Sequence, residues 1–363
     1  MLFKTETTEK RNKDRSFRAG TALKAVLALC VCALLTGCGG SGENLKAAYA
    51  KLDEMDYDGA LACLDGAREA GEDPREIARA AGIAYMGQAD YVSAAKQFEE
   101  SLHSGTGYPD AMDTDINFYL AAAYDSMGDY AAAEDRYNAI IEFSDDTEGY
   151  LLRASARLKQ SNFEAAVSDF NIVISRDPYD YDTLIGIYEM LSAIGYRDAG
   201  LEYIKAAING DQGRMTDSEK GRMYYYMEDY TQAAALLESA RNADGTVISS
   251  LFLGRSYEAM GEYNYAANVY ESYIGTKGAN AELYDQLGLC RLKMGEYEAA
   301  LQAFKAGIEA DDGTFAKSLE YNQAVAYEYI ADFETARELM KAYIAKYPDD
   351  LEAAREIRFL ETR

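Results

Sequence analysis

The hydrophobic and polar positions of this chain repeat with a period of about 34 residues. In the segment 253–266, Gly254 is followed by Tyr257, a polar turn, Tyr263 and Ala266. The second aromatic residue of each copy serves as an anchor, and an alanine follows every anchor three residues later. The nine anchors are Tyr57, Tyr91, Tyr130, Phe163, Tyr196, Tyr230, Tyr263, Tyr297 and Phe333.

Each period predicts two short antiparallel helices joined by a tight turn. Small residues such as Gly82 and Gly254 occupy positions where the two helices must approach closely. Glycines such as Gly128 and Gly261 follow the first helix, where a left-handed residue ends a helix at little cost. The acids or Asn that precede most anchors can cap the second helix. No such pair buries its apolar face alone, so neighbouring pairs must stack into one continuous core.

A period near 34 with this pattern resembles the tetratricopeptide repeat, whereas the T-P-L-H motif of the ankyrin repeat is absent. The resemblance implies an all-α fold, a right-handed superhelical α-solenoid. About nine helix–turn–helix repeats would occupy residues 43–348, and a capping helix would occupy residues 349–363. Pro178 and Pro348 each follow an anchor by fifteen residues, where the second helix should stop.

Residues 1–37 do not follow the repeat. Seven Lys or Arg residues precede the apolar run Ala25–Leu35, as in a secretory signal peptide. This run is shorter than the roughly 20 residues that span a bilayer. It ends in Leu35-Thr36-Gly37-Cys38, which resembles the lipobox of bacterial lipoproteins. The resemblance implies removal of residues 1–37, a diacylglyceryl lipid on Cys38 and a short tether at 38–42. A plain signal peptide with a chance cysteine is the alternative.

Charge and composition exclude several functions. The formal net charge of −26 argues against nucleic acid and against adsorption to anionic lipid. The chain has a single His and lacks CxxC, HExxH and phosphate-loop motifs, so it predicts no metal, no cofactor and no enzyme. Cys63 and Cys290 are expected to be buried small hydrophobic residues. Ser104–Asp115 predicts a loop, and Asp113–Asn117 predicts the start of a helix because it lacks the glycine of a calcium loop.

The family resemblance also implies a concave groove. Its lining would come from first-helix positions twelve, eight, five and four residues before the anchors. Arg222 and Arg255 hold equivalent positions in adjacent repeats and would lie side by side, unless they only pair with neighbouring acids such as Glu219 or Glu258. The Lys and Asn pattern of the carboxylate-clamp subtype is not met, since Ser218 stands at one of its Lys positions. The predicted partner-binding residues are Tyr188, Arg222, Tyr225, Tyr226, Leu251, Arg255, Glu258, Tyr321 and Tyr329.

These features predict a lipid-anchored scaffold for protein interactions in the bacterial cell envelope. It would lie on the extracytoplasmic face of the membrane or in a periplasm, and would bind a peptide or protein segment in the groove. The alternative is a binder of a cell-wall glycan or surface polymer, which the absence of Trp makes less favourable.

Overall fold

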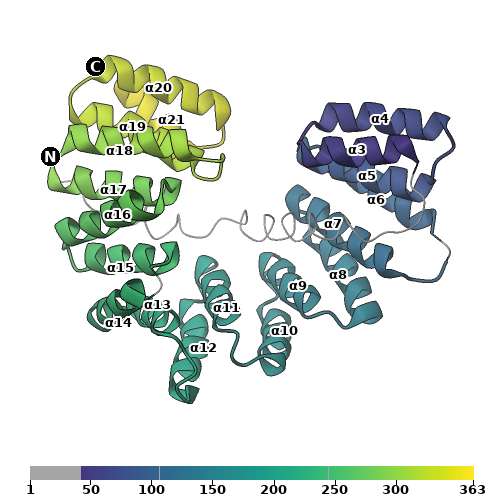
Figure 1. Cartoon of the computed structure of the whole chain (residues 1–363), viewed down its shortest axis with the longest axis horizontal. Coiled ribbons are helices and arrows are strands. Elements are labelled where there is room, and N and C mark those ends of the chain that lie inside the picture. Colours follow the sequence, from purple (N-terminus) through teal and green to yellow (C-terminus); the bar gives the residue numbers. More distant parts are fainter. Residues whose placement is uncertain (1–41, 106, 244) are drawn as a thin grey trace. The chain divides into compact units, whose positions relative to one another are not determined.

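The computed structural model describes residues 42–105, 107–243 and 245–363 (Figure 1). The signal segment 1–37, Cys38 and the tether up to residue 41 lie outside the described residues, so the statements about them stay predictions. The described residues contain nineteen α-helices and no strand. The prediction of an all-α fold built from helix pairs is therefore confirmed.

The described residues up to Tyr203 form one compact unit, and Ile204–Arg363 form a second. The first unit contains α3 (Glu43–Asp53), α4 (Tyr57–Glu69), α5 (Pro74–Gly87), α6 (Tyr91–His103), α7 (Ala111–Met127), α8 (Tyr130–Ser144), α9 (Thr147–Lys159), α10 (Phe163–Arg176) and α11 (Tyr181–Ala193). Helix α12 (Arg197–Gly210) crosses the boundary. The second unit contains α13 (Asp217–Tyr226), α14 (Tyr230–Ala243), α15 (Val247–Ala259), α16 (Tyr263–Lys277), α17 (Ala281–Met294), α18 (Tyr297–Ala310), α19 (Ala316–Tyr329), α20 (Phe333–Lys346) and α21 (Leu351–Leu360).

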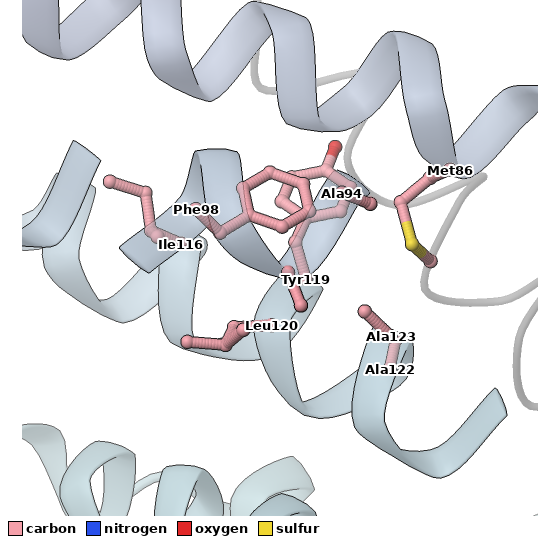
Figure 2. Packing of buried hydrophobic residues seen from close by; sticks show 9 residues of the cluster. Met86, Ala94, Phe98, Ile116, Tyr119, Leu120, Ala122 and Ala123 are labelled. Atoms are coloured by element: carbon pink, nitrogen blue, oxygen red, sulfur yellow. The ribbon is translucent and has the colours of Figure 1, made fainter. Parts of the chain in front are cut away.

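The core is a series of small clusters between successive helices. In one of them the ring of Phe98 on α6 stacks on the ring of Tyr119 on α7, with centroids 5.3 Å apart (Figure 2). Gly82 on α5 is needed beside Phe98, because a Cβ atom there would lie 2.5 Å from the ring. The small residues of the pattern thus mark the close approaches of helices, as predicted. Eight of the nine alanines that follow the anchors are fully buried.

The turn inside each helix pair has the same backbone form. A residue with positive φ precedes the residue that caps the second helix. This residue is glycine in four turns, such as Gly128, but Met55, Ala89, Ser161, Glu228 and Ala331 hold it in the other five. Asp and Asn caps accept a backbone N–H, as Asp90 does from Ser93. Glu262 and Glu296 stand at the same position without making such a bond.

The fifth helix pair, α11 and α12, differs from the predicted alignment. Helix α12 begins at Arg197, and Tyr196 holds the cap position after the positive-φ Gly195, so Tyr196 is not the anchor. With the register moved by one residue, Gly200 takes the buried place that alanine has elsewhere. Tyr188 then stands where the other first helices carry Gly or Ala. The two residues touch, since a Cβ atom on Gly200 would lie 3.0 Å from Cδ2 of Tyr188.

Two further predictions need correction. The loop predicted at Ser104–Asp115 ends earlier, because Asp110 caps α7 through a capping box with Asp113. The helix start predicted within Asp113–Asn117 lies in α7, as expected.

Cys290 is buried as predicted, but Cys63 is only half-buried, and both are free thiols. At the C-terminal end, Ala353 and Leu360 of α21 pack into a cluster with Met340 of α20.

Candidate partner-binding surface

The first helices of the repeats in residues 204–363 carry the predicted arginine pair. Helix α13 contacts α15, and α17 contacts α19. Glycines allow the close packing behind these helices: a Cβ atom on Gly221 would lie 2.5 Å from Leu237 of α14, and one on Gly254 would lie 2.2 Å from Tyr270 of α16. The residues on the opposite faces of α13 and α15, away from α14 and α16, are therefore close to one another.

The two arginines meet at one aromatic ring. The guanidinium carbon of Arg222 lies 5.5 Å from the ring centroid of Phe252, and that of Arg255 lies 5.6 Å from it. Both distances are within the range of a cation–π interaction. The prediction that these arginines lie side by side is consistent with this geometry, and Phe252 is the residue that joins them.

Two tyrosines complete the group. Tyr225 and Tyr226 each meet the ring of Phe252 in a T-shaped arrangement, with centroids 5.3 Å and 5.6 Å away. Phe252 itself is buried, whereas Arg222, Tyr225, Tyr226 and Arg255 are half-buried. We call these five residues the Phe252 cluster. Its two guanidinium groups and two phenol rings all contact the buried ring of Phe252.

Sequence reasoning missed Phe252 because it lies eleven residues before its anchor, outside the face assigned to the groove. The spacing along the sequence does indicate Phe252. It is three residues before Arg255 on the same helix, so the two side chains lie on one side of α15.

The partner of Arg255 is neither of the predicted acids. Nη2 of Arg255 lies 2.9 Å from Oε1 of Glu282 on α17. Burial lowers the pKa of Arg255, but Glu282 and, to a smaller extent, Tyr225, Tyr270 and Tyr226 together raise the pKa above its usual value, so the guanidinium stays charged. Glu219 instead takes part in the capping box of α13 with Thr216.

Glu258 is half-buried and is hydrogen-bonded to a core residue. Its carboxylate accepts a hydrogen bond from the hydroxyl of Tyr270, which is fully buried. Burial raises the pKa of Glu258, against the opposing effects of Tyr270 and Arg255. Burial and this carboxylate also raise the pKa of Cys290, which keeps the thiol protonated and unreactive. Glu258 therefore links helices α15, α16 and α17.

The other predicted residues lie outside the Phe252 cluster, and among them only Tyr329 is exposed. Leu251 and Tyr321 are core residues, and Tyr321 meets Tyr343 edge-on at 5.5 Å. Tyr188 is buried in the first unit because of the register change in the fifth pair. Tyr329 is 46% exposed but stacks on Tyr297 at 5.1 Å, which is a contact between successive repeats. Four of the nine predicted residues thus belong to the cluster.

A buried hydrogen bond also joins α17 and α19, which are the next two first helices along the chain. Nδ2 of Asn322 on α19 donates to Oδ1 of Asp285 on α17 over 2.7 Å, and both residues are buried. Among the described residues, no group of three or more His, Cys, Asp or Glu side chains is arranged to hold a metal ion. None of the described helices combines the length and the apolar character that crossing a bilayer requires.

Comparison with protein families identifies tetratricopeptide repeats in two parts of the chain. Residues 118–181 match one family model described as a tetratricopeptide repeat, and residues 318–350 match another. The BBSome complex member BBS4 of Bos taurus is 23% identical over 144 residues, which are 39% of this chain. The chain spans only 28% of the length of that relative.

Solved structures with a similar arrangement include tetratricopeptide-repeat proteins. One, from Parabacteroides merdae, is 14% identical, with a TM-score of 0.49 over 79% of this chain and 99% of that chain. YrrB, described as a TPR protein with an unusual peptide-binding site, is 24% identical, with a TM-score of 0.36 over 52% of this chain and 97% of that one. A chain of the APC/C hetero-tetramer Cut9–Hcn1 is 14% identical, with a TM-score of 0.42 over 87% and 83%.

Proposed function

We propose that this chain of tetratricopeptide repeats is a non-catalytic scaffold that binds a segment of a partner protein on the Phe252 cluster. The observation that supports the proposal is the convergence of Arg222, Tyr225, Tyr226 and Arg255 on one buried ring. Tyr and Arg are among the residue types that contribute most to binding energy at protein interfaces.

The cluster suits a segment that carries an acidic group beside an apolar side chain. A guanidinium held against a ring keeps its planar set of donors in one orientation, which matches the two oxygens of a carboxylate. Arg255 is held further by Glu282. Tyr225 and Tyr226 would give the apolar side chain a rigid contact surface at low cost in side-chain entropy. Either an extended peptide or one face of a helix could make these contacts.

The test is crosslinking in intact cells of the source organism, followed by mass spectrometry. The variant Arg222→Glu/Tyr225→Ala/Arg255→Glu removes the proposed contacts. The matched control, Arg241→Glu/Tyr265→Ala/Arg291→Glu, makes the same changes of charge and size elsewhere in residues 204–363, where Arg241 and Arg291 pair with exposed acids. We expect a protein crosslinked to the wild type and to the control to be lost from the cluster variant. An unchanged set of partners would contradict the proposal. Retention on purified cell-wall polymer without any crosslinked protein would support the glycan alternative instead.

We further propose that the scaffold is anchored through a diacylglyceryl group on Cys38, on the extracytoplasmic face of a bacterial membrane or in a periplasm. The support is the lipobox-like sequence Leu35-Thr36-Gly37-Cys38 after a basic segment and an apolar run. The variant Cys38→Ala should move from the membrane fraction to the soluble fraction, since two acyl chains suffice for stable anchoring. Continued membrane retention of this variant would contradict the proposal, and the mass of the N-terminal peptide provides an independent check.

A further inference from the structure

A carboxylate lies on the same helix as the Phe252 cluster without belonging to it. Glu258 follows Arg255 by three residues on α15, so the two side chains share one side of that helix. Arg255 pairs with Glu282 of α17, and it also attracts the charge of Glu258. An acidic ligand that approaches Arg255 therefore meets two resident carboxylates, and their negative charge opposes its binding.

Glu258 interacts with titratable groups from three helices. On α16 the fully buried Tyr270 donates a hydrogen bond from its hydroxyl to the carboxylate. On α17 the interacting groups are the thiol of Cys290, which is 1% exposed, and the carboxylate of Asp285, which is 5% exposed. On α15 itself the interacting charge is that of Arg255. Glu258 is thus partly removed from water and lies near a second, buried acid.

The two other helices that pack on α15 direct their charged groups to its neighbouring residues. On α13, Arg222, Tyr225 and Tyr226 contact Phe252. On α14, Glu238 and Arg241 act on Tyr257, the residue before Glu258. The environment of the Glu258 carboxylate is consequently set by α15, α16 and α17.

This environment favours the uncharged form of Glu258. Removal from water raises the pKa of Glu258, and repulsion by Asp285 raises it further. Tyr270, Arg255 and Cys290 act in the opposite direction, but the pKa stays above its usual value of 4.5. Glu258 therefore takes up a proton at a higher pH than an ordinary glutamate does. The protonated group still has an oxygen that can accept from Tyr270, so the helices need not separate when the charge is lost.

We propose that Glu258 makes the Phe252 cluster sensitive to pH, so that an acidic segment of a partner binds more tightly when Glu258 is protonated. This inference rests on the proposed function of the cluster and adds its regulation. Ionised Glu258 repels the anion of the ligand and competes with it for Arg255, whereas the neutral form does neither. An uncharged ligand does not distinguish the two forms. By linkage, a bound anion increases the proton affinity of Glu258 by the same factor.

The test measures the affinity of the full chain for two capped dipeptides by saturation-transfer NMR, at about pH 5 and at about pH 7.5. N-acetyl-Phe-cysteic acid-amide carries a sulfonate, which stays ionised at both pH values. N-acetyl-Phe-Gln-amide is its uncharged counterpart. We expect the sulfonate probe to bind about three- to tenfold more tightly at the lower pH, and the Gln probe to bind equally at both.

Two variants assign the pH dependence to Glu258. Glu258→Gln should bind the sulfonate probe at about pH 7.5 as tightly as the wild type does at about pH 5, with no dependence on pH. Tyr270→Phe keeps the buried ring but removes the hydrogen bond that favours the ionised carboxylate, so the rise in affinity should begin at a higher pH than in the wild type. The control Glu262→Gln makes the same change of charge at an exposed residue without a cap hydrogen bond and should keep the wild-type pH dependence.

The outcomes separate this inference from the proposed function. Binding of the sulfonate probe with equal affinity at both pH values, or a pH dependence that persists in Glu258→Gln, would overturn the role of Glu258 and leave binding at the cluster intact. No binding of this probe at either pH, or unchanged binding in Arg222→Glu/Tyr225→Ala/Arg255→Glu, would overturn both. Circular dichroism of each variant checks that it is folded, and Tyr270→Phe decides the matter if Glu258→Gln is not.

Discussion

Asp169 is a buried acid of the first unit that is paired with two arginines. It is 1% exposed, and its two carboxylate oxygens each lie 2.7 Å from a guanidinium nitrogen, one of Arg153 and one of Arg157. The hydrogen bonds that Arg153 donates to Asp169 raise the pKa of Arg153 in spite of burial. Glu134 pairs with Arg157 as well, so the group contains two cations and two anions.

Asp169→Asn should destabilise the first unit by about 3–5 kcal/mol, because it leaves two partly buried guanidinium groups with one carboxylate fewer. Urea denaturation followed by circular dichroism measures the change in the free energy of unfolding. Asp65→Asn is the control, since Asp65 pairs with Arg68 at the surface and its loss should cost less than about 1 kcal/mol. Similar losses in the two variants would mean that the buried network does not stabilise the unit.

At the scale of single residues, part of the surface was predictable and part was not. Arg222 and Arg255 hold the same place in adjacent repeats, and spacing along the chain was enough to pair them. Phe252 depends on how α15 packs against α13, which spacing alone does not contain. The exposed tyrosines of the sequence pattern could not be separated from buried ones such as Tyr321, because both kinds follow the same helical period.

Among the elements, the pair α11 and α12 shows best how the sequence pattern can mislead. Tyr196 is an aromatic residue three positions before an alanine, as an anchor should be, yet the backbone turn follows Gly195 and places Tyr196 at the cap. The turn geometry therefore decides the register, and the aromatic residue does not. The other pairs could be aligned correctly because their turns keep an acid or Asn directly before the anchor.

The altered register predicts opposite effects for two glycines. Gly186→Ala on α11 should stabilise the chain by up to about 1 kcal/mol, because nothing lies within 4 Å of the new methyl group and alanine favours helix. Gly200→Ala on α12 should destabilise it by about 1–2 kcal/mol net, because the methyl group would lie 3.1 Å from the Cα and carbonyl oxygen of Tyr188, which cannot move freely. Thermal unfolding measures both. A stabilising Gly200→Ala would show that the two helices separate at little cost.

The first described helix depends on a cap from another element. Gly42 precedes α3 and supplies no side chain, but the carboxylate of Glu72 accepts hydrogen bonds from the backbone N–H groups of Asn44 and Leu45. Removal from water raises the pKa of Glu72, but these hydrogen bonds outweigh it and the pKa falls below its usual value of 4.5. A lowered pKa means that the cap stabilises α3 fully above pH 4.5 and is lost as the pH falls through the folded-state value.

Glu72→Gln should therefore increase hydrogen exchange in α3 at pH 7, and the difference from the wild type should shrink as the pH falls below 4.5. Exchange mass spectrometry of peptides covering residues 43–53, corrected for the intrinsic pH dependence of exchange, measures this. Glu69→Gln is a control at an exposed residue nearby and should not change the protection of α3. Equal protection in Glu72→Gln and the wild type at pH 7 would rule out a capping role.

At the scale of the whole molecule, each helix contacts mainly its neighbours along the chain, as expected for a repeat array. Stability in such an array is close to a sum of repeat terms and nearest-neighbour terms. The loss of stability caused by Asp169→Asn should consequently be largest in the repeats next to Asp169 and should decline with distance along the array. Hydrogen exchange should rise most in α8, α9 and α10 and progressively less towards α3, while Ile204–Arg363, which form a separate compact unit, keep wild-type protection. A partner captured through the proposed Phe252 cluster should then still be recovered. A uniform rise in exchange over all described residues would instead mean that the chain unfolds as one cooperative body.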